Sequence, residues 1–244
     1  MPSTIPSLAR AIRVMNALAE GGEFSSLGLA KRLGISQSTC YRILQTLEDA
    51  DWIRAENGGY AFSRGLLPFV KPLMDVENLV TALRPDMESL AQSTGLTVKL
   101  SRRQGAEQVT IARVQSPRPI ALSSTVGARF PVVLGASGAC LLSVLDDETV
   151  ERLVEDADER KQWEHESADE LRQRIAACRA RGICENIGNH PQGIDTISAL
   201  LTCRLGAFAL TLVGLRGDFT GSRRTDWRRL LLETAQRERG GLTQ

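Results

Sequence analysis

The segment that most constrains this chain consists of two short amphipathic stretches joined at a single glycine. Apolar side chains recur three positions apart at Leu27, Ala30 and Leu33, which predicts a short helix with a buried stripe. Gly34 follows at once, and glycine readily takes the left-handed conformation that ends a helix. Residues 37–47 then predict a second helix. Two such helices joined by a tight turn are typical of a helix-turn-helix, whose second helix enters the major groove of DNA.

Serine residues precede both predicted helices. Ser25 or Ser26 can cap the first helix and Ser36 the second, because a hydroxyl accepts hydrogen bonds from the unpaired N–H groups of a first turn. One face of the second helix is apolar and carries Cys40, Ile43, Leu44 and Leu47.

The start and the opposite face of the second helix are polar. Arginine can make paired hydrogen bonds to guanine and glutamine to adenine, whereas hydroxyls at a helix start suit phosphates. An ordinary surface helix with a solvated polar face is the alternative. The residues that we predict to contact DNA are Ser36, Gln37, Ser38, Thr39, Tyr41, Arg42 and Gln45.

A β-hairpin is predicted directly after the second helix. Residues 52–55 and 60–62 resemble strands, and the four residues Glu56-Asn57-Gly58-Gly59 between them supply the positive φ angles of a tight turn. The hairpin favours a winged helix-turn-helix over an ordinary surface helix. Upstream we expect a supporting helix with Ser7 as its cap and Gly21-Gly22 as its stop. Its predicted apolar stripe is Leu8, Ile12, Met15 and Ala19.

Length and composition limit the possible classes of protein. A chain of 244 residues suits two domains, and its net charge of +1 gives no overall signature of nucleic-acid binding. Five scattered cysteines without a C-x-x-C pair favour a reducing compartment. Neither a signal peptide nor an apolar run of the roughly 20 residues that span a membrane is visible. We therefore expect a cytoplasmic protein with no membrane partner.

The segment that follows the hairpin is apolar and contains proline. Residues 66–74 include Pro68 and Pro72, so a helix here is expected to be kinked or to begin near Pro72. A second helical stretch, residues 79–93, is expected to restart at Pro85 and to stop at Gly95. A connector this apolar is expected to pack either against the chain's own domains or against a second subunit.

The remaining residues predict an α+β domain on an antiparallel sheet. We expect its strands near residues 97–100, 109–114, 120–123, 182–186, 194–201 and 207–215. We expect its helices near residues 136–145, 148–154, 168–181 and 226–239, with Gly182 closing the third of them. The charged stretch 155–170 is expected to form a solvated loop beside a helix.

Several motifs resemble the IclR family of bacterial transcriptional regulators, over essentially the whole chain. The closest likeness lies in residues 29–39 (Leu-Ala-Lys-Arg-Leu-Gly-Ile-Ser-Gln-Ser-Thr) and 41–47 (Tyr-Arg-Ile-Leu-Gln-Thr-Leu). Residues 126–131 (Val-Gly-Ala-Arg-Phe-Pro) are similar to the family's entry into its ligand domain, and residues 135–139 (Gly-Ala-Ser-Gly-Ala) to its small-residue loop. The resemblance implies a winged helix-turn-helix over residues 1–63, a linker helix over 64–80 and a GAF-like domain over 81–244.

What the resemblance implies for function is a regulator that binds a double-stranded DNA operator as a homodimer or tetramer. Its GAF-like domain would bind a small carboxylic or aromatic acid, with the start of a helix at residues 136–138 facing the anion. By position, the effector pocket of the family corresponds to Leu122, Ala136, Ser137, Gly138, Asn186, Ile194, Thr196, Thr211 and Val213.

Three positions depart from the family pattern. Ala139 stands where a lysine is usual, Thr196 where a cysteine is usual, and Asn186 where an acidic residue is common. A pocket with fewer charges predicts a preference for a more neutral or aromatic acid.

Other classes of function find less support in the residues. A hydrolase would need Gly-x-Ser-x-Gly at residues 135–139, but Ala139 ends that run, and only His165 and His190 could serve a catalytic triad. Cys178, Cys184 and His190 lack the spacing of standard zinc ligands, so we expect no metal and no cofactor. A regulator whose second domain only oligomerises and binds no effector remains the alternative.

Overall fold

A computed structural model describes residues 5–21, 25–119, 122, 125–161, 163, 166–190 and 192–241. The chain divides into two compact units, Met1–Asp75 and Val76–Gln244. The boundary lies within residues 64–80, where a linker helix is expected. We describe each unit separately.

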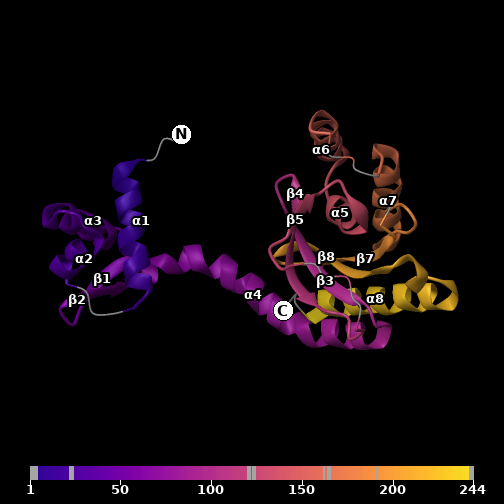
Figure 1. The fold of residues 1–244 in the computed structure, drawn as a ribbon, viewed down its shortest axis with the longest axis horizontal. Helices are drawn as coiled ribbons and strands as arrows, with labels where there is room; N and C mark the ends of the chain where they lie inside the picture. The colour runs from indigo at the N-terminus through magenta and orange to yellow at the C-terminus, as the bar shows by residue number, and fades with distance from the viewer. Residues whose placement is uncertain are drawn as a thin grey trace. The chain divides into compact units, whose positions relative to one another are not determined.

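The first unit is a winged helix-turn-helix (Figure 1). Its helices are α1 (Pro6–Ala19), α2 (Ser26–Leu33) and α3 (Gln37–Asp49), followed by the strands β1 (Ile53–Glu56) and β2 (Gly59–Phe62) and a short 3-10 helix (Arg64–Leu66). All three helices and the hairpin contribute side chains to one apolar core. The fully buried members of this core are Val14, Leu29, Cys40 and Leu44, each with no exposed surface.

The predicted turn between α2 and α3 is confirmed. The Ser25 hydroxyl accepts from the Gly28 N–H at 3.1 Å, and the Ser36 hydroxyl accepts from the Thr39 N–H at 3.2 Å. Gly34 has φ 64°, a left-handed conformation that costs glycine little. The two serines and this glycine fix where α2 and α3 begin and where α2 ends.

The predicted buried stripes are partly wrong. In α1 the buried residues are Val14, Ala17 and Leu18, whereas Leu8 and Ile12 are 56% and 50% exposed. Only about half of the helix contacts the core, so its apolar residues near the N-terminus stay outside. Ala19 is exposed as well, and Met15 is half-buried.

The cap of α1 and the stripe of α2 also differ from expectation. Ser7 does not cap α1, because the helix begins at Pro6, where the missing N–H of proline has no intrahelical partner to lose. Gly21 has φ 80° after the end of α1, and Gly22 lies outside the described residues. In α2, Leu29 is buried and Leu27 is 46% exposed. Positions 29 and 33 are four residues apart and lie on the same face as position 30. Position 27 lies away from the centre of that face, so its side chain is exposed.

The hairpin turns at Asn57-Gly58 as predicted, but Glu56 and Gly59, expected in the turn, belong to the strands. Ile53 pairs with Phe62 and Glu56 with Gly59, which leaves a two-residue loop. Its residues Asn57 and Gly58 have φ angles of 49° and 78°. Positive φ at both positions is the type I′ geometry that matches the twist of paired strands.

One long helix, α4 (Leu67–Thr94), replaces the interrupted connector that we predicted. Pro68 lies in its first turn, where an N–H has no partner. Pro72 and Pro85 lie further along and each removes one backbone hydrogen bond without ending the helix. Beyond Pro85 the helix is anchored by Met87 and Leu90, both buried against the sheet of the second unit. Gly95, with φ 68°, ends α4 as expected.

The second unit is an α+β domain on a six-stranded antiparallel sheet. Strand order across the sheet is β5-β4-β3-β8-β7-β6. The strands are β3 (Thr97–Gln104), β4 (Glu107–Val114), β5 (Arg129–Pro131), β6 (Ile183–Asn186), β7 (Ile194–Cys203) and β8 (Gly206–Leu215). A further 3-10 turn (Arg216–Asp218) precedes the last helix, α8 (Gly221–Gly241).

Helices cover both faces of this sheet. Figure 1 shows α5 (Gly135–Leu142), α6 (Asp147–Glu159) and α7 (Ala168–Arg181) on one side, and α8 with the end of α4 on the other. Alternation along β3 sends Val98 and Leu100 into the core formed with α4 and α8. Lys99, between them, therefore faces the side of α5.

Several details of the second unit differ from the predictions. The strand β3 runs on to Gln104, α5 ends at Leu142 rather than 145, and α8 begins at Gly221 rather than 226. The strand β5 was not predicted, since Arg-Phe-Pro carries no apolar alternation. In the predicted strand 120–123, only Leu122 lies within the described residues, and it is not in a strand. The charged stretch 155–170 is not simply a loop, because residues 155–159 extend α6 and residues 168–170 begin α7.

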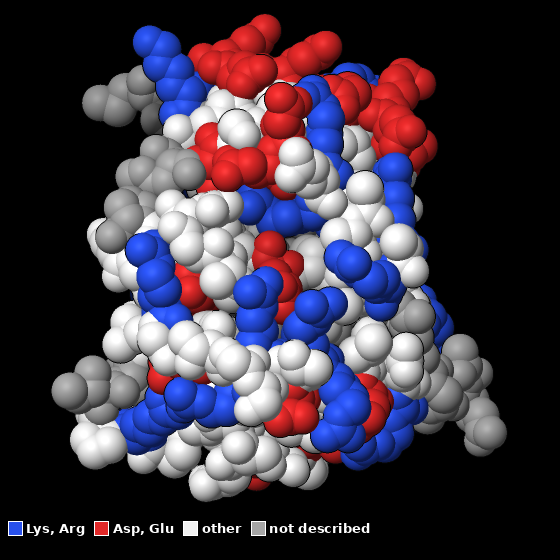
Figure 2. Space-filling model, turned by 90° about the vertical axis from the view of Figure 1, so that its right-hand side faces the viewer, with Lys and Arg blue, Asp and Glu red and all other residues white. Residues whose placement is uncertain are grey.

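Charge is unevenly distributed over the second unit. Figure 2 shows acidic side chains gathered at the end where α6 lies. The sequence of this helix, Asp-Glu-Thr-Val-Glu-Arg-Leu-Val-Glu-Asp-Ala-Asp-Glu, is dominated by carboxylates. Such a concentration of carboxylates gives this end of the unit a negative potential.

Candidate nucleic-acid interface and ligand cavity

The polar face of α3 is exposed over most of its length. Tyr41 is 54% exposed, and Gln37, Ser38, Arg42 and Gln45 are exposed as well. Cys40, Leu44 and Leu47 on the opposite face are buried in the core. The exposed face can therefore approach a DNA groove without disturbing the fold.

The predicted DNA-contacting residues differ in how free their side chains are. Arg42 makes no hydrogen bond or ion pair through its side chain to any other residue that the structure describes. The Gln45 amide donates to Asp49 Oδ1 at 3.0 Å. Ser36 caps the helix and also donates to the Thr39 hydroxyl at 2.8 Å, and Thr39 is half-buried. Among the described residues of this face, Arg42 is thus a cation whose side chain is available to bind DNA.

A cavity of about 330 Å³ lies between the sheet and the start of α5. This volume is typical of pockets for small molecules, about 300–1,000 Å³. Strands β3, β7 and β8 form one wall of it and the β5–α5 turn another. Its lining residues are Thr97, Lys99, Gln108, Leu122, Phe130, Pro131, Leu134, Gly135, Ser137, Glu166, Asn186, His190, Ile194, Thr196 and Val213.

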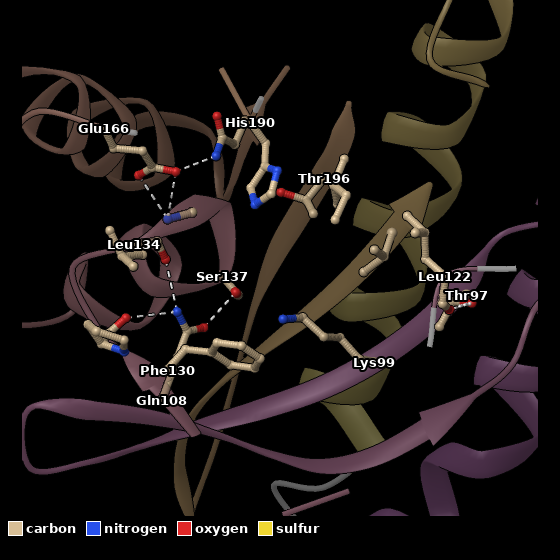
Figure 3. A pocket seen from close by; sticks show the side chains of 15 residues that line it. Thr97, Lys99, Gln108, Leu122, Phe130, Leu134, Ser137, Glu166, His190 and Thr196 are labelled. Atoms are coloured by element: carbon tan, nitrogen blue, oxygen red, sulfur yellow. Dashed lines mark hydrogen bonds between the residues drawn. The ribbon is translucent and has the colours of Figure 1, made fainter. Parts of the chain in front are cut away.

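Lys99 supplies a positive charge to the interior of the cavity. Figure 3 shows its amine reaching from β3 toward the side of Ser137 and Gln108. Its Nζ lies 5.7 Å from the centroid of the Phe130 ring. No carboxylate among the described residues pairs with it. Burial lowers the pKa of Lys99 to about 8, because the charged form has lost its hydration.

Gln108 fixes the turn that leads into α5. Its amide donates to the carbonyl oxygens of Leu134 at 2.9 Å and Pro131 at 3.1 Å (Figure 3). Its own carbonyl accepts from the Ser137 hydroxyl at 2.6 Å. Ser137, the serine considered as a nucleophile, therefore has an amide rather than a histidine as its partner.

The start of α5 already holds a carboxylate. Glu166 accepts from the Gly135 N–H at 3.0 and 3.2 Å and from the Asn186 amide (Figure 3). Arg174 also donates to it. The side chains of Glu166 and Arg174 are each 8% exposed. A helix start favours an anion. Here the protein's own Glu166 takes the place that we expected a ligand to occupy.

Six of the nine residues predicted for the effector pocket line the cavity, namely Leu122, Ser137, Asn186, Ile194, Thr196 and Val213. The other three do not. Ala136 is fully buried in the core beneath α5. Gly138 packs against the Val132 carbonyl, which a Cβ would meet at 2.0 Å. The Thr211 hydroxyl is buried and bonds to the Ser198 hydroxyl at 2.8 Å.

The sequence prediction missed Lys99, Gln108 and Glu166. Lysine in the middle of an apolar strand was a usable signal for Lys99, since alternation places it opposite the buried Val98 and Leu100. Gln108 is the second residue of β4 and is buried, which its sequence context did not indicate. Glu166 carried no such signal, because it stands in a run of charged residues.

Comparison with known proteins identifies both units. Residues 7–56 match the IclR helix-turn-helix domain, and residues 72–238 match the bacterial transcriptional regulator IclR C-terminal domain. The regulator TtgV of Pseudomonas putida is 24% identical over 86% of this chain and 81% of that protein. The transcriptional repressor IclR of Escherichia coli is 23% identical over 95% of this chain and 88% of that protein.

Solved structures show the same fold. The IclR protein of Thermotoga maritima matches with a TM-score of 0.61 at 17% identity, over 98% of this chain and 99% of that one. HmgR of Pseudomonas aeruginosa matches with a TM-score of 0.58 at 21% identity, over 98% of each chain. The two regulators similar in sequence are likewise described as acting on transcription, not as enzymes. Within the described residues, none of the helices combines the length and apolarity needed to cross a lipid bilayer.

Proposed function

Since the chain belongs to the IclR family of bacterial transcriptional regulators and carries the family's helix-turn-helix domain, we propose that α3 reads an operator and that the cavity binds a small organic acid that modulates this reading. The observation that carries the effector proposal is the ammonium group of Lys99, which lies in the cavity and has no carboxylate partner among the described residues.

The lining of the cavity suits an acid with an aromatic or unsaturated body. Lys99 would pair with its carboxylate, and Phe130, Leu122 and Ile194 would cover its apolar part. Glu166 occupies the helix start, so a second negative group placed there would be repelled. We therefore propose a monocarboxylate rather than a small, highly charged acid.

DNA reading would depend on Arg42 and Gln37, whose side chains are exposed on the polar face of α3 and bond to no other described residue. Ser36 and Thr39 would act mainly by fixing the helix start, and Ser38, Tyr41 and Gln45 would add neighbouring contacts. Such a protein would act in the cytoplasm, on double-stranded DNA.

Self-association would place two copies of α3 on successive half-sites. The surface that supports it is the first part of α4, where large apolar side chains are exposed. These are Leu67, Phe69, Val70, Leu73 and Met74, which are 54%, 60%, 40%, 67% and 55% exposed. We propose a homodimer, or a dimer of dimers, that covers them.

Thermal-shift screening of a carboxylate panel tests the effector proposal. A ligand present at 100 times its dissociation constant adds about 2.7 kcal/mol to the free energy of unfolding. Binding that is lost in Ser137→Trp, which fills the cavity, supports the proposal. If the panel yields no ligand, the regulator whose second domain only oligomerises is the better account.

A further inference from the structure

Three cysteines from different elements meet inside the second unit. They are Cys140 of α5, Cys178 of α7 and Cys184 of β6, and their Sγ atoms all lie within 4.8 Å of one another. Cys178 Sγ is 3.3 Å from Cys140 Sγ, which is 3.6 Å from Cys184 Sγ. Their exposed fractions are 0%, 1% and 3%, and none of them forms a disulfide. Sequence spacing gave no sign of this thiol triad.

The thiol triad has the dimensions of a three-coordinate site. A metal–thiolate bond of about 2.3 Å places three ligands in a plane about 4.0 Å apart, and closer if the centre is pyramidal. No histidine, aspartate or glutamate of the described chain joins the triad. The carbonyl oxygens of Ser198 and Ala136 lie 3.2 and 3.3 Å from the Sγ atoms of Cys140 and Cys184. The described residues therefore do not form a closed four-ligand zinc site.

The net charge of the occupied site determines which ion the triad can bind. The three thiols are buried in an apolar cluster that includes Leu141, Ile175 and Leu200. Arg174 lines the same cavity as Cys184, but its charge is already paired with Glu166.

A site with net charge is costly in these surroundings. Three thiolates around a monovalent or divalent ion keep a negative charge, and burying an uncompensated charge costs several kcal/mol. Three thiolates around a trivalent centre are neutral. A trivalent thiophilic element therefore avoids this cost.

We propose that Cys140, Cys178 and Cys184 bind trivalent arsenic, supplied as arsenite. Three As–S bonds form and the three As–O bonds of As(OH)₃ break. Each S–H proton leaves with one hydroxide as water, so three water molecules are released. No electrons are transferred, and the net charge of the site does not change.

A second cavity borders the triad at Cys184. It measures about 310 Å³ and is lined by Cys184 together with polar residues of α7 and α8, among them Gln173, Arg174 and Arg224. Arsenite is small and uncharged at neutral pH, so it can pass these residues without an ion-pairing cost. Once bound, it would link α5, α7 and β6 covalently, which is expected to raise the melting temperature.

The test uses the full chain, reduced and then incubated with arsenite. After gel filtration we expect one arsenic atom per chain, three sulfur neighbours in the arsenic X-ray absorption spectrum, and a raised melting temperature. Cys203→Ala is the matched control, because Cys203 lies outside the triad, and it should behave like the unaltered protein. Cys178→Ala should lose both the retained arsenic and the thermal shift.

Several results would overturn the proposal. These are no retained arsenic, fewer than three sulfur neighbours, or unchanged retention in Cys178→Ala. If Cys178→Ala does not fold, as judged by circular dichroism, the sulfur count in the unaltered protein decides. Parallel incubations with Zn²⁺ and Cu⁺ test the charge argument, which fails if either ion displaces arsenic from the three sulfurs.

Discussion

Replacing Lys99 with methionine should change stability and ligand binding in opposite directions. Burial lowers the pKa of Lys99 from 10.5 to about 8. Since one pKa unit corresponds to about 1.36 kcal/mol, keeping this ammonium charged at neutral pH costs the fold about 3 kcal/mol. Methionine has a similar length and no charge, so Lys99→Met is expected to raise the free energy of unfolding without ligand. The gain should approach this value near pH 7 and shrink as pH rises from 8 toward 10.5.

The same substitution should weaken binding of the acid. A hydrogen bond to a charged partner contributes about 1.5–3 kcal/mol, which corresponds to roughly 10- to 150-fold in the dissociation constant. Isothermal titration calorimetry measures the affinity of both proteins for the acid and for its neutral amide. The four affinities form a thermodynamic cycle that gives the interaction free energy of the ion pair. The amide should bind the two proteins about equally. Lys31→Met, which removes a charge from α2 in the first unit, is the control.

Two results would refute this reasoning. One is a Lys99→Met protein that is less stable than the unaltered protein near neutral pH, since the ammonium would then be stabilising. The other is an unchanged preference for the acid over its amide, which would place the carboxylate away from Lys99.

Four further predictions concern the pH dependence of acid binding, the buried ion pair, the DNA-reading face and self-association. Because pairing with a carboxylate should restore the pKa of Lys99 toward its usual value, acid affinity should be constant below about pH 8 and fall by up to about tenfold per pH unit above it, whereas calorimetry on Lys99→Met should show no such fall. Glu166→Ala leaves Arg174 buried without its carboxylate and should lower the free energy of unfolding by about 3–5 kcal/mol in urea denaturation. Glu107→Ala, in the exposed pair with Arg129, should cost less than about 1 kcal/mol, and equal losses would contradict the assigned burial. Arg42→Ala should reduce discrimination between operator and scrambled DNA by about 1–3 kcal/mol in gel-shift titrations, while the exposed Arg10→Ala keeps it, and loss in both would indicate phosphate contacts alone. Light scattering should give the mass of at least two chains, reduced by Leu73→Glu but not by Val144→Glu, and a monomer at micromolar concentration would refute the proposed interface.

Local sequence signals predicted the DNA-binding unit well. Ser25, Gly34 and Ser36 determine helix ends through their own backbone and side chains, and the Asn57-Gly58 turn sets the register of the hairpin. Faces that depend on tertiary contacts were harder to predict. Leu8 and Ile12 have the spacing of a buried stripe, but the core reaches only the second half of α1. In α4, the helix continues through Pro85, beyond which Met87 and Leu90 are buried against the sheet.

The interior of the second unit could be predicted only in part. The family resemblance brought together Ser137, Asn186, Ile194 and Thr196, which do line the cavity. It did not reveal that Glu166 fills the helix start, because that contact joins a charged loop to Gly135. The thiol triad could not be predicted from the sequence either. Cys140 and Cys184 are far apart in sequence, and their proximity depends on how α5 packs against β6.

The most direct test of the regulatory account is operator affinity measured with and without the acid found by screening. An operator fragment selected by the unaltered protein is titrated by fluorescence anisotropy at several acid concentrations. We predict a change of about 5- to 150-fold in the dissociation constant for DNA, which corresponds to a coupling free energy of about 1–3 kcal/mol. The change should saturate at the concentrations that saturate the thermal shift, and it should be absent in Lys99→Met. An operator affinity that stays constant while the cavity is occupied would contradict the account.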